Sequence, residues 1–203
     1  MNTVFNYNQE EAAQIGGSSY VSKSGGYDFK IVSAKFVNST NSQARALEMD
    51  LETRDGLKCN YISINFLNGQ GQPNLYGNKL IQAIMGVTGA QQLNEAPDGS
   101  CPNLVGKFMK AVVQRIDYTK NNGGDGYKFE IKLPAHIQTS KTVKETIDNS
   151  AASAFDKYAA SIEDKDERTQ SAPTQHQREN SQPQSTAPQY NDGPMDFDDD
   201  IPF

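Results

Sequence analysis

The segment 45–53 alternates apolar and polar side chains over its whole length, and no other feature constrains the fold of this chain as strongly. Leu47, Met49 and Leu51 fall on one face of an extended strand, and acidic side chains fall on the opposite face. A period of two residues is typical of a strand with one buried and one exposed face. Such a strand needs neighbours, so the adjacent segments should complete a sheet.

Four further segments carry strand patterns. Residues 27–37 are rich in β-branched and aromatic side chains, and residues 57–67 alternate after a turn at Asp55-Gly56. Residues 104–118 are apolar on both faces, and residues 127–133 alternate again. We therefore expect five strands.

The third of these segments suggests which side chains face outward. Its alternation directs Ile62 and Ile64 into the core, and Cys59 and Tyr61 to the opposite face. Tyr61 is therefore the aromatic ring that the sequence most favours as exposed.

A helix is expected between the third and fourth strands. Its apolar residues recur at helical spacing and are Tyr76, Leu80, Ala83, Ile84 and Val87. Three strands, a helix and two strands follow each other in this order in an OB-fold, a mainly β, five-stranded Greek-key barrel. The order alone does not fix how the strands pair, so another small α+β sheet remains an alternative.

A second, C-terminal helix is expected after the last strand. The segment 142–145 fits a capping box, with Thr142 and Glu145 at its two ends. One apolar stripe follows, formed by Val143, Ile147, Ala151, Phe155, Tyr158 and Ile162. This helix is expected either to pack on the barrel or to build an oligomer contact.

Composition divides the chain into five parts. Glutamine, serine and proline dominate from residue 166, and such a segment buries too little apolar surface to fold. The expected parts are a flexible arm (1–19), an OB-fold domain (20–138), an amphipathic helix (139–165), a disordered linker (166–194) and an acidic protein-interaction tip (195–203).

The net charge is distributed unevenly. The whole chain carries −6, but residues 1–150 carry +1 and residues 151–203 carry −7. Residues 17–144 hold 15 basic and 10 acidic side chains. A mildly basic body is compatible with nucleic-acid binding, although the charge of the whole chain is not.

Catalytic and metal-binding patterns are not evident. The two cysteines, Cys59 and Cys101, and the two histidines, His136 and His176, lack the spacing of a metal or nucleophile motif. We expect no enzyme, no catalytic residue, no cofactor and no metal. The sequence has neither a signal-peptide pattern nor an apolar run of membrane-spanning length, so a cytoplasmic protein without membrane contact is expected.

Basic and aromatic side chains alternate along the expected strands, as in proteins that stack bases on rings and pair phosphates with lysine or arginine. Each ring could equally belong to the core. The candidate nucleic-acid-binding residues are Lys30, Lys35, Arg54, Lys58, Tyr61, Lys107, Lys110, Arg115, Tyr118, Lys120, Tyr127 and Lys128.

The last residues of the sequence suit docking to another protein. An aromatic ring with a carboxylate can enter a basic pocket, and the aspartates can face its rim. A solvated acidic tail is the alternative. The segment resembles the C-terminal tip of bacterial single-stranded DNA-binding proteins (SSB), and the resemblance covers Asp198, Asp199, Asp200, Ile201, Pro202 and Phe203.

The polar linker before the tip is also similar to that of SSB. The chain has no tryptophan, so the tryptophan platforms of that family have no counterpart here. Tyr76-Gly77-Asn78-Lys79-Leu80 and Leu104-Val105-Gly106-Lys107 look more like phage-encoded single-stranded DNA-binding proteins.

These resemblances imply a protein that coats and protects single-stranded DNA in replication and recombination, within the bacterial host cytoplasm. Its tip would recruit host replication, recombination and repair proteins that bind SSB tails, and it could form a homo-oligomer. Two alternatives stay open: a recombination mediator or strand-annealing protein, and an OB-fold adaptor that binds only protein.

Overall fold

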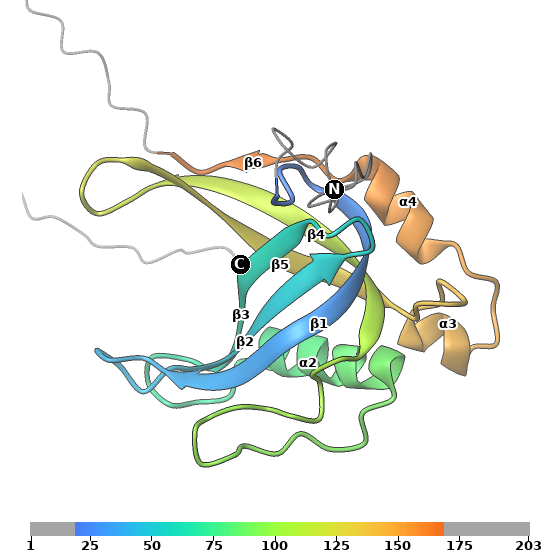
Figure 1. Cartoon of the computed structure of the whole chain (residues 1–203), viewed down its shortest axis with the longest axis horizontal. Coiled ribbons are helices and arrows are strands. Elements are labelled where there is room, and N and C mark those ends of the chain that lie inside the picture. Colours follow the sequence, from blue (N-terminus) through green and yellow to red (C-terminus); the bar gives the residue numbers. More distant parts are fainter. Residues whose placement is uncertain (1–18, 169–203) are drawn as a thin grey trace, which may run out of the picture. The chain divides into compact units, whose positions relative to one another are not determined.

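In the computed structural model, which describes residues 19–168, the chain is mainly β and is built on one six-stranded sheet (Figure 1). The strands are β1 (Gly25–Asn38), β2 (Arg45–Thr53), β3 (Lys58–Leu67), β4 (Phe108–Thr119), β5 (Asp125–Ala135) and β6 (Lys165–Asp166). The helices are α2 (Leu75–Thr88), α3 (Val143–Ile147) and α4 (Ala154–Ser161). The five expected strands and the helix between the third and the fourth are confirmed.

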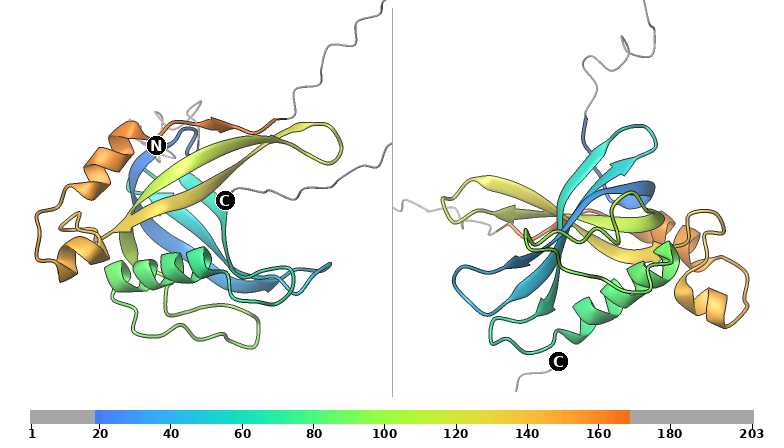
Figure 2. Two further views of the ribbon diagram at one scale, coloured as in Figure 1. Left: turned by 180° about the vertical axis from the view of Figure 1, so that it is seen from behind. Right: turned by 60° about the horizontal axis from the view of Figure 1, so that its bottom comes forward.

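The strands follow the order β3-β2-β1-β4-β5, and each neighbouring pair is antiparallel. Four reversals of direction make the two outer strands, β3 and β5, run the same way. The sheet curves strongly, and α2 lies across one end of it (Figure 2). No ladder joins β3 to β5 within residues 19–168, so the sheet is not closed and the expected OB-fold barrel is not confirmed.

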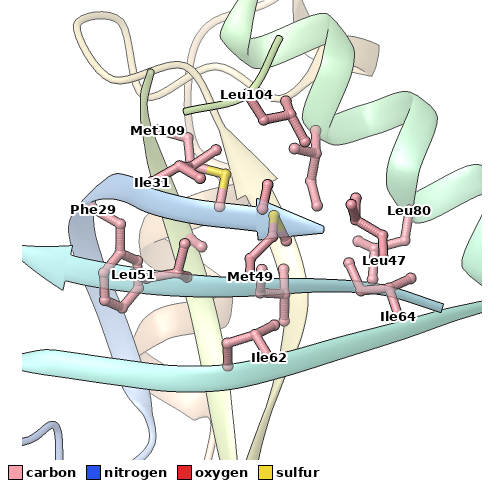
Figure 3. Packing of buried hydrophobic residues seen from close by; sticks show 14 of the residues in the cluster. Phe29, Ile31, Leu47, Met49, Leu51, Ile62, Ile64, Leu80, Leu104 and Met109 are labelled. Carbon is pink, nitrogen blue, oxygen red and sulfur yellow. The ribbon is translucent and has the colours of Figure 1, made fainter. Parts of the chain in front are cut away.

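The main core lies between the curved sheet and α2. Leu47, Met49 and Leu51 are all buried there, as their alternation predicts, and Leu80 of α2 meets Leu47 and Ile64 (Figure 3). The helix begins where the Asn74 side chain accepts a hydrogen bond from the Gly77 N–H, and it ends at Gly89, whose φ is 68°.

The prediction that Cys59 faces outward is wrong. Its side chain is 2% exposed, and burial raises the pKa of its thiol to about 12. Met49 pairs with Ile62, but Leu51 pairs with Cys59, so β3 contains one residue more than β2 between these pairs. This β-bulge turns Cys59 inward as well as Ile62, and period-two alternation cannot anticipate it.

Strand β4 is buried on both faces, as its sequence predicts, although it begins at Phe108 and not at residue 104. Met109 and Val113 belong to the main core. Val112 lies in a second cluster with Phe155, so α4 packs against the outer face of the sheet.

The prediction of a single C-terminal helix is wrong, because the segment forms two short helices. The expected capping box at Thr142 is present, but Asn149 has a φ of 48° and ends the first helix. The buried carboxylate of Glu145 then accepts hydrogen bonds from the N–H groups of Ser153 and Ala154, at the start of α4. Ile147, expected on the apolar stripe, is 77% exposed.

Glu145 should make the docking of these helices sensitive to acid. Backbone hydrogen bonds lower the pKa of Glu145 from 4.5 to about 2. Its ionised form therefore stabilises the fold fully above pH 4.5, and this contribution disappears as the pH falls towards about 2. Glu145→Gln should melt at a lower temperature than the wild type above pH 4.5, and the difference should shrink on acidification. A difference that does not change with pH would contradict this role.

Residues 165–168, which include the expected start of the linker, are described and lie beside the sheet. Lys165 and Asp166 pair with β4, and the Glu167 N–H donates to the Asp117 carbonyl. Residues 1–18 and 169–203, which include most of the expected arm and linker, His176 and the whole tip, lie outside the described residues. Within residues 19–168, no helix is both long and apolar enough to cross a membrane.

Candidate nucleic-acid interface

A cavity of about 480 Å³ opens between the outer strands β3 and β5. Its walls also include Val21, Cys59, Asn60 and Phe129. We call it the aromatic groove, after the tyrosines and lysines that line it: Tyr20, Lys58, Tyr61, Tyr118, Tyr127 and Lys128. Five of these six residues are among the predicted nucleic-acid-binding residues, and they come from three different strands.

The segment that precedes β1 supplies the sixth. Val21 donates its N–H to the Lys58 carbonyl, and Lys58 donates its N–H to the Ser19 carbonyl. These bonds hold residues 19–21 along the edge of β3 and bring Tyr20 to the groove. The sequence prediction missed Tyr20 because it precedes the first strand pattern and only pairing in the folded chain brings it there.

Tyr61 has an unusual backbone conformation. It lies at the β3 bulge with a φ of 58°, a left-handed conformation that costs a residue with a side chain roughly 1 kcal/mol or more. The Tyr61 N–H donates to Asp50 Oδ1 at 2.9 Å, and Ser33 Oγ donates to Asp50 Oδ2 at 2.7 Å. Tyr61 is 73% exposed, so this strained backbone holds its ring in solvent at the groove and does not bury it.

Tyr127 is supported from one side by an arginine. The Arg115 guanidinium lies 4.4 Å from the centre of the Tyr127 ring. It also donates to Asp117 Oδ1 and to the Ser22 carbonyl, so this predicted phosphate ligand is engaged within the fold. Tyr127 lines two cavities. Arg115 also lines the first, which is small, but it does not line the second, the aromatic groove. The ring thus lies between the two cavities, with Arg115 4.4 Å and the Phe129 ring 6.0 Å from its centre, and Tyr127 remains half exposed.

Every second residue of β5 beside the groove is charged, and we call this row of Lys128, Glu130 and Lys132 the charge ladder. Glu130 lies between Lys128 and Lys132, with oxygen–nitrogen distances of 2.7 and 2.8 Å. Burial opposes ionisation of Glu130, but the hydrogen bonds from both lysines outweigh it and keep its pKa below the usual value. With one carboxylate between two ammonium groups, the charge ladder keeps a net positive charge.

Two other predicted residues line a separate cavity of about 480 Å³ on the outer face of β1, and a third, Lys110, lies near Asp28 in its wall. Lys30 and Arg54 line it together with the half-exposed Phe108. Arg54 and Lys110 both approach Asp28, at 3.7 and 3.6 Å, and Lys110 also lies over the Phe155 ring. This surface shares no lining residue with the aromatic groove.

The remaining predicted residues do not gather. Lys35 pairs with Glu48 at 2.8 Å, and Lys107 donates to the Thr88 carbonyl at the end of α2. Lys107 thus satisfies an otherwise open helix carbonyl, a structural role. Lys120 lies in the turn between β4 and β5.

Acidic residues on β2 have partners of their own. Glu48 pairs with Lys35, and Asp50 accepts the two hydrogen bonds described above. Within residues 19–168, no group of three or more histidine, cysteine, aspartate or glutamate side chains could hold a metal ion.

No protein-family model matches this chain, and no curated protein sequence matches it either. The function must therefore be inferred from the chemistry of the groove.

Proposed function

We propose that this chain is a single-stranded DNA-binding protein that holds its ligand in the aromatic groove. The observation that carries the proposal is the gathering of four tyrosines and two lysines around one cavity. Rings that stack on bases, next to cations that meet phosphates, are the usual means of binding single strands without sequence preference.

The groove suits a single strand better than a duplex. Tyr61 and Tyr127 present rings to solvent, and a base can stack on such a ring only when it is not paired inside a double helix. Lys58 and Lys128 stand beside these rings and are exposed, in position for the phosphates between successive bases. Coating of single-stranded DNA during replication and recombination is the role that this binding would serve.

The order of the strands supports an OB-fold as part of the proposal. A helix between the third and fourth strands, and a central β1 that pairs with both β2 and β4, are features of that fold. In this chain, β3 and β5 face each other across the groove without pairing. We propose an OB-fold whose last seam is left open, with the ligand lying along that seam.

Titration of a fluorescent oligothymidylate with the full-length chain, followed by anisotropy, tests the proposed function. We expect binding to the single strand that is much tighter than binding to a duplex of the same length. Affinity should fall with salt, with a log–log slope of about −0.7 for each phosphate contact. Equal affinity for both forms, or no binding at low salt, would overturn the proposal.

The acidic segment Asp198–Phe203 carries the second half of the proposed function, the recruitment of host genome-maintenance proteins. It lies outside the described residues, and its support is its resemblance to SSB tips. Deletion of residues 198–203 should abolish binding to purified SSB-tail-binding enzymes and leave the affinity for oligothymidylate undiminished. Retained enzyme binding would show that the segment is only a solvated acidic tail.

A further inference from the structure

A smaller cavity lies farther along the seam between β3 and β5, where α2 begins. It has a volume of about 180 Å³, and we call it the helix-end cavity. Ser63 and Asn65 line it from β3, Glu130 from β5, and Asn74 and Tyr76 from the start of the helix. Because β3 and β5 run in the same direction, the residues that line this cavity come after those that line the aromatic groove on both strands, directly on β5 and after Ile62 on β3.

Tyr76 is unusual among the residues of α2. Its spacing places it on the apolar stripe of the helix, yet its side chain is 61% exposed. Lys79 follows one turn later on the same side of the helix and is also exposed. Tyr76 and Lys79 thus repeat the pairing of a ring and a cation found in the aromatic groove.

The start of α2 is held firmly against β3. Asn74 donates its N–H to the Phe66 carbonyl, and its side chain caps Gly77. The Asn78 amide donates to the Phe66 carbonyl as well. These bonds fix the backbone that carries Tyr76 next to the end of β3, so its ring is attached to a rigid part of the fold.

We propose that the helix-end cavity is a second base-binding position for single-stranded DNA, continuous with the aromatic groove. Tyr76 is its stacking ring, and Lys79 is its phosphate contact. The carboxylate of Glu130 does not prevent this, because Lys128 and Lys132 both pair with it. The inference rests on the proposed function and adds the direction in which the strand leaves the groove.

The two positions are too far apart for a very short ligand to occupy both. Asn65 lies four positions after Tyr61 along β3, which corresponds to about 13 Å at 3.3 Å per residue. A short oligonucleotide that fills the aromatic groove should therefore not reach Tyr76, whereas a longer one should.

Binding of oligothymidylates of increasing length to the full-length chain tests the inference. The lengths should run from about 2 nucleotides, too short to reach both positions, to about 16, the upper end of the site sizes found for OB-folds. We expect Tyr76→Ala to bind the shortest oligonucleotides as the wild type does and the longest about tenfold more weakly. Tyr76→Phe should restore wild-type binding, because it keeps the ring. Leu75→Ala is the matched control, since Leu75 is the preceding residue and is 73% exposed.

The outcomes separate this inference from the proposed function. If the wild type binds none of the oligonucleotides, the proposed function fails, and the inference fails with it. If the wild type binds but Tyr76→Ala matches it at every length, only the second position is refuted. A loss that is equal at all lengths would also refute it, because Tyr76 would then belong to the first position.

Discussion

Replacement of Gly77 by alanine should destabilise the fold by about 3 kcal/mol, near the upper end of the usual cost of overpacking. A Cβ atom at this position would lie 1.9 Å from the Asn65 carbonyl oxygen. The Cβ atom is fixed directly to the helix backbone and the carbonyl oxygen is itself backbone, so α2 would have to move away from β3. Alanine is favoured over glycine in a helix by only about 1 kcal/mol, which does not offset the overlap. Urea denaturation should show a lower midpoint for the variant.

Two glycine variants serve as comparisons for Gly77→Ala. At Gly69 a Cβ atom would make ordinary contacts with Ser42 at 3.7 Å, so Gly69→Ala should change stability little. At Gly86, within α2, the Cβ atom would meet the Val143 side chain at 2.7 Å. A side chain yields more readily than backbone, so Gly86→Ala should cost less than Gly77→Ala. Unchanged stability of Gly77→Ala would mean that α2 does not approach β3 as described.

Replacement of Tyr61 by glycine should weaken binding of single-stranded DNA by roughly 1–3 kcal/mol without lowering stability. Loss of the ring removes a stacking surface, whereas glycine adopts the left-handed conformation at this position freely. Stability and affinity should therefore respond differently to one substitution. Anisotropy with oligothymidylate measures the affinity, and thermal melting measures the stability.

Further variants of Tyr61 and of Asp50, which accepts its N–H, provide the controls. Tyr61→Phe keeps the ring and should bind like the wild type. Asp50→Ala removes the carboxylate that accepts the Tyr61 N–H, so it should weaken binding with the ring still present, and Asp50→Asn should restore part of the affinity because its amide oxygen can accept that bond. A Tyr61→Gly variant that melts earlier and binds normally would show that Tyr61 has a structural role.

The sequence predicts the strands well because their patterns reflect one local cause, the burial of alternate side chains. Arg45–Thr53 has the predicted bounds, and the hydrophobic residues of β4 are buried on both faces as expected. The helix between β3 and β4, Leu75–Thr88, contains every residue of its predicted apolar stripe. Each of these elements buries a regular set of positions, so its periodicity is visible in the sequence.

Features that depend on contacts between distant residues could not be predicted. The bulge that buries Cys59 and exposes Tyr61 needs Asp50 from the neighbouring strand. The break between α3 and α4 lies at Asn149, and Glu145 accepts hydrogen bonds at the start of both helices, although its sequence pattern shows only the first cap.

The candidate site could likewise be predicted only in part, and for the same reason. Sequence proximity of aromatic and basic residues singled out Tyr61, Tyr127 and Lys128, and all three line the aromatic groove. It could not distinguish them from Lys107. That side chain donates a hydrogen bond to the Thr88 carbonyl at the end of α2, 19 residues away in the sequence.

Photo-cross-linking tests the central claim, that single-stranded DNA lies along the seam between β3 and β5, most directly. An oligothymidylate that carries iodouracil would be cross-linked to the full-length chain, and the linked peptides would be identified by mass spectrometry. We expect cross-links to the peptides that contain Tyr61 and Tyr127, and they should be lost when unlabelled oligothymidylate competes. Cross-links confined to the peptide that contains Phe108, on the outer face of β1, would contradict the claim.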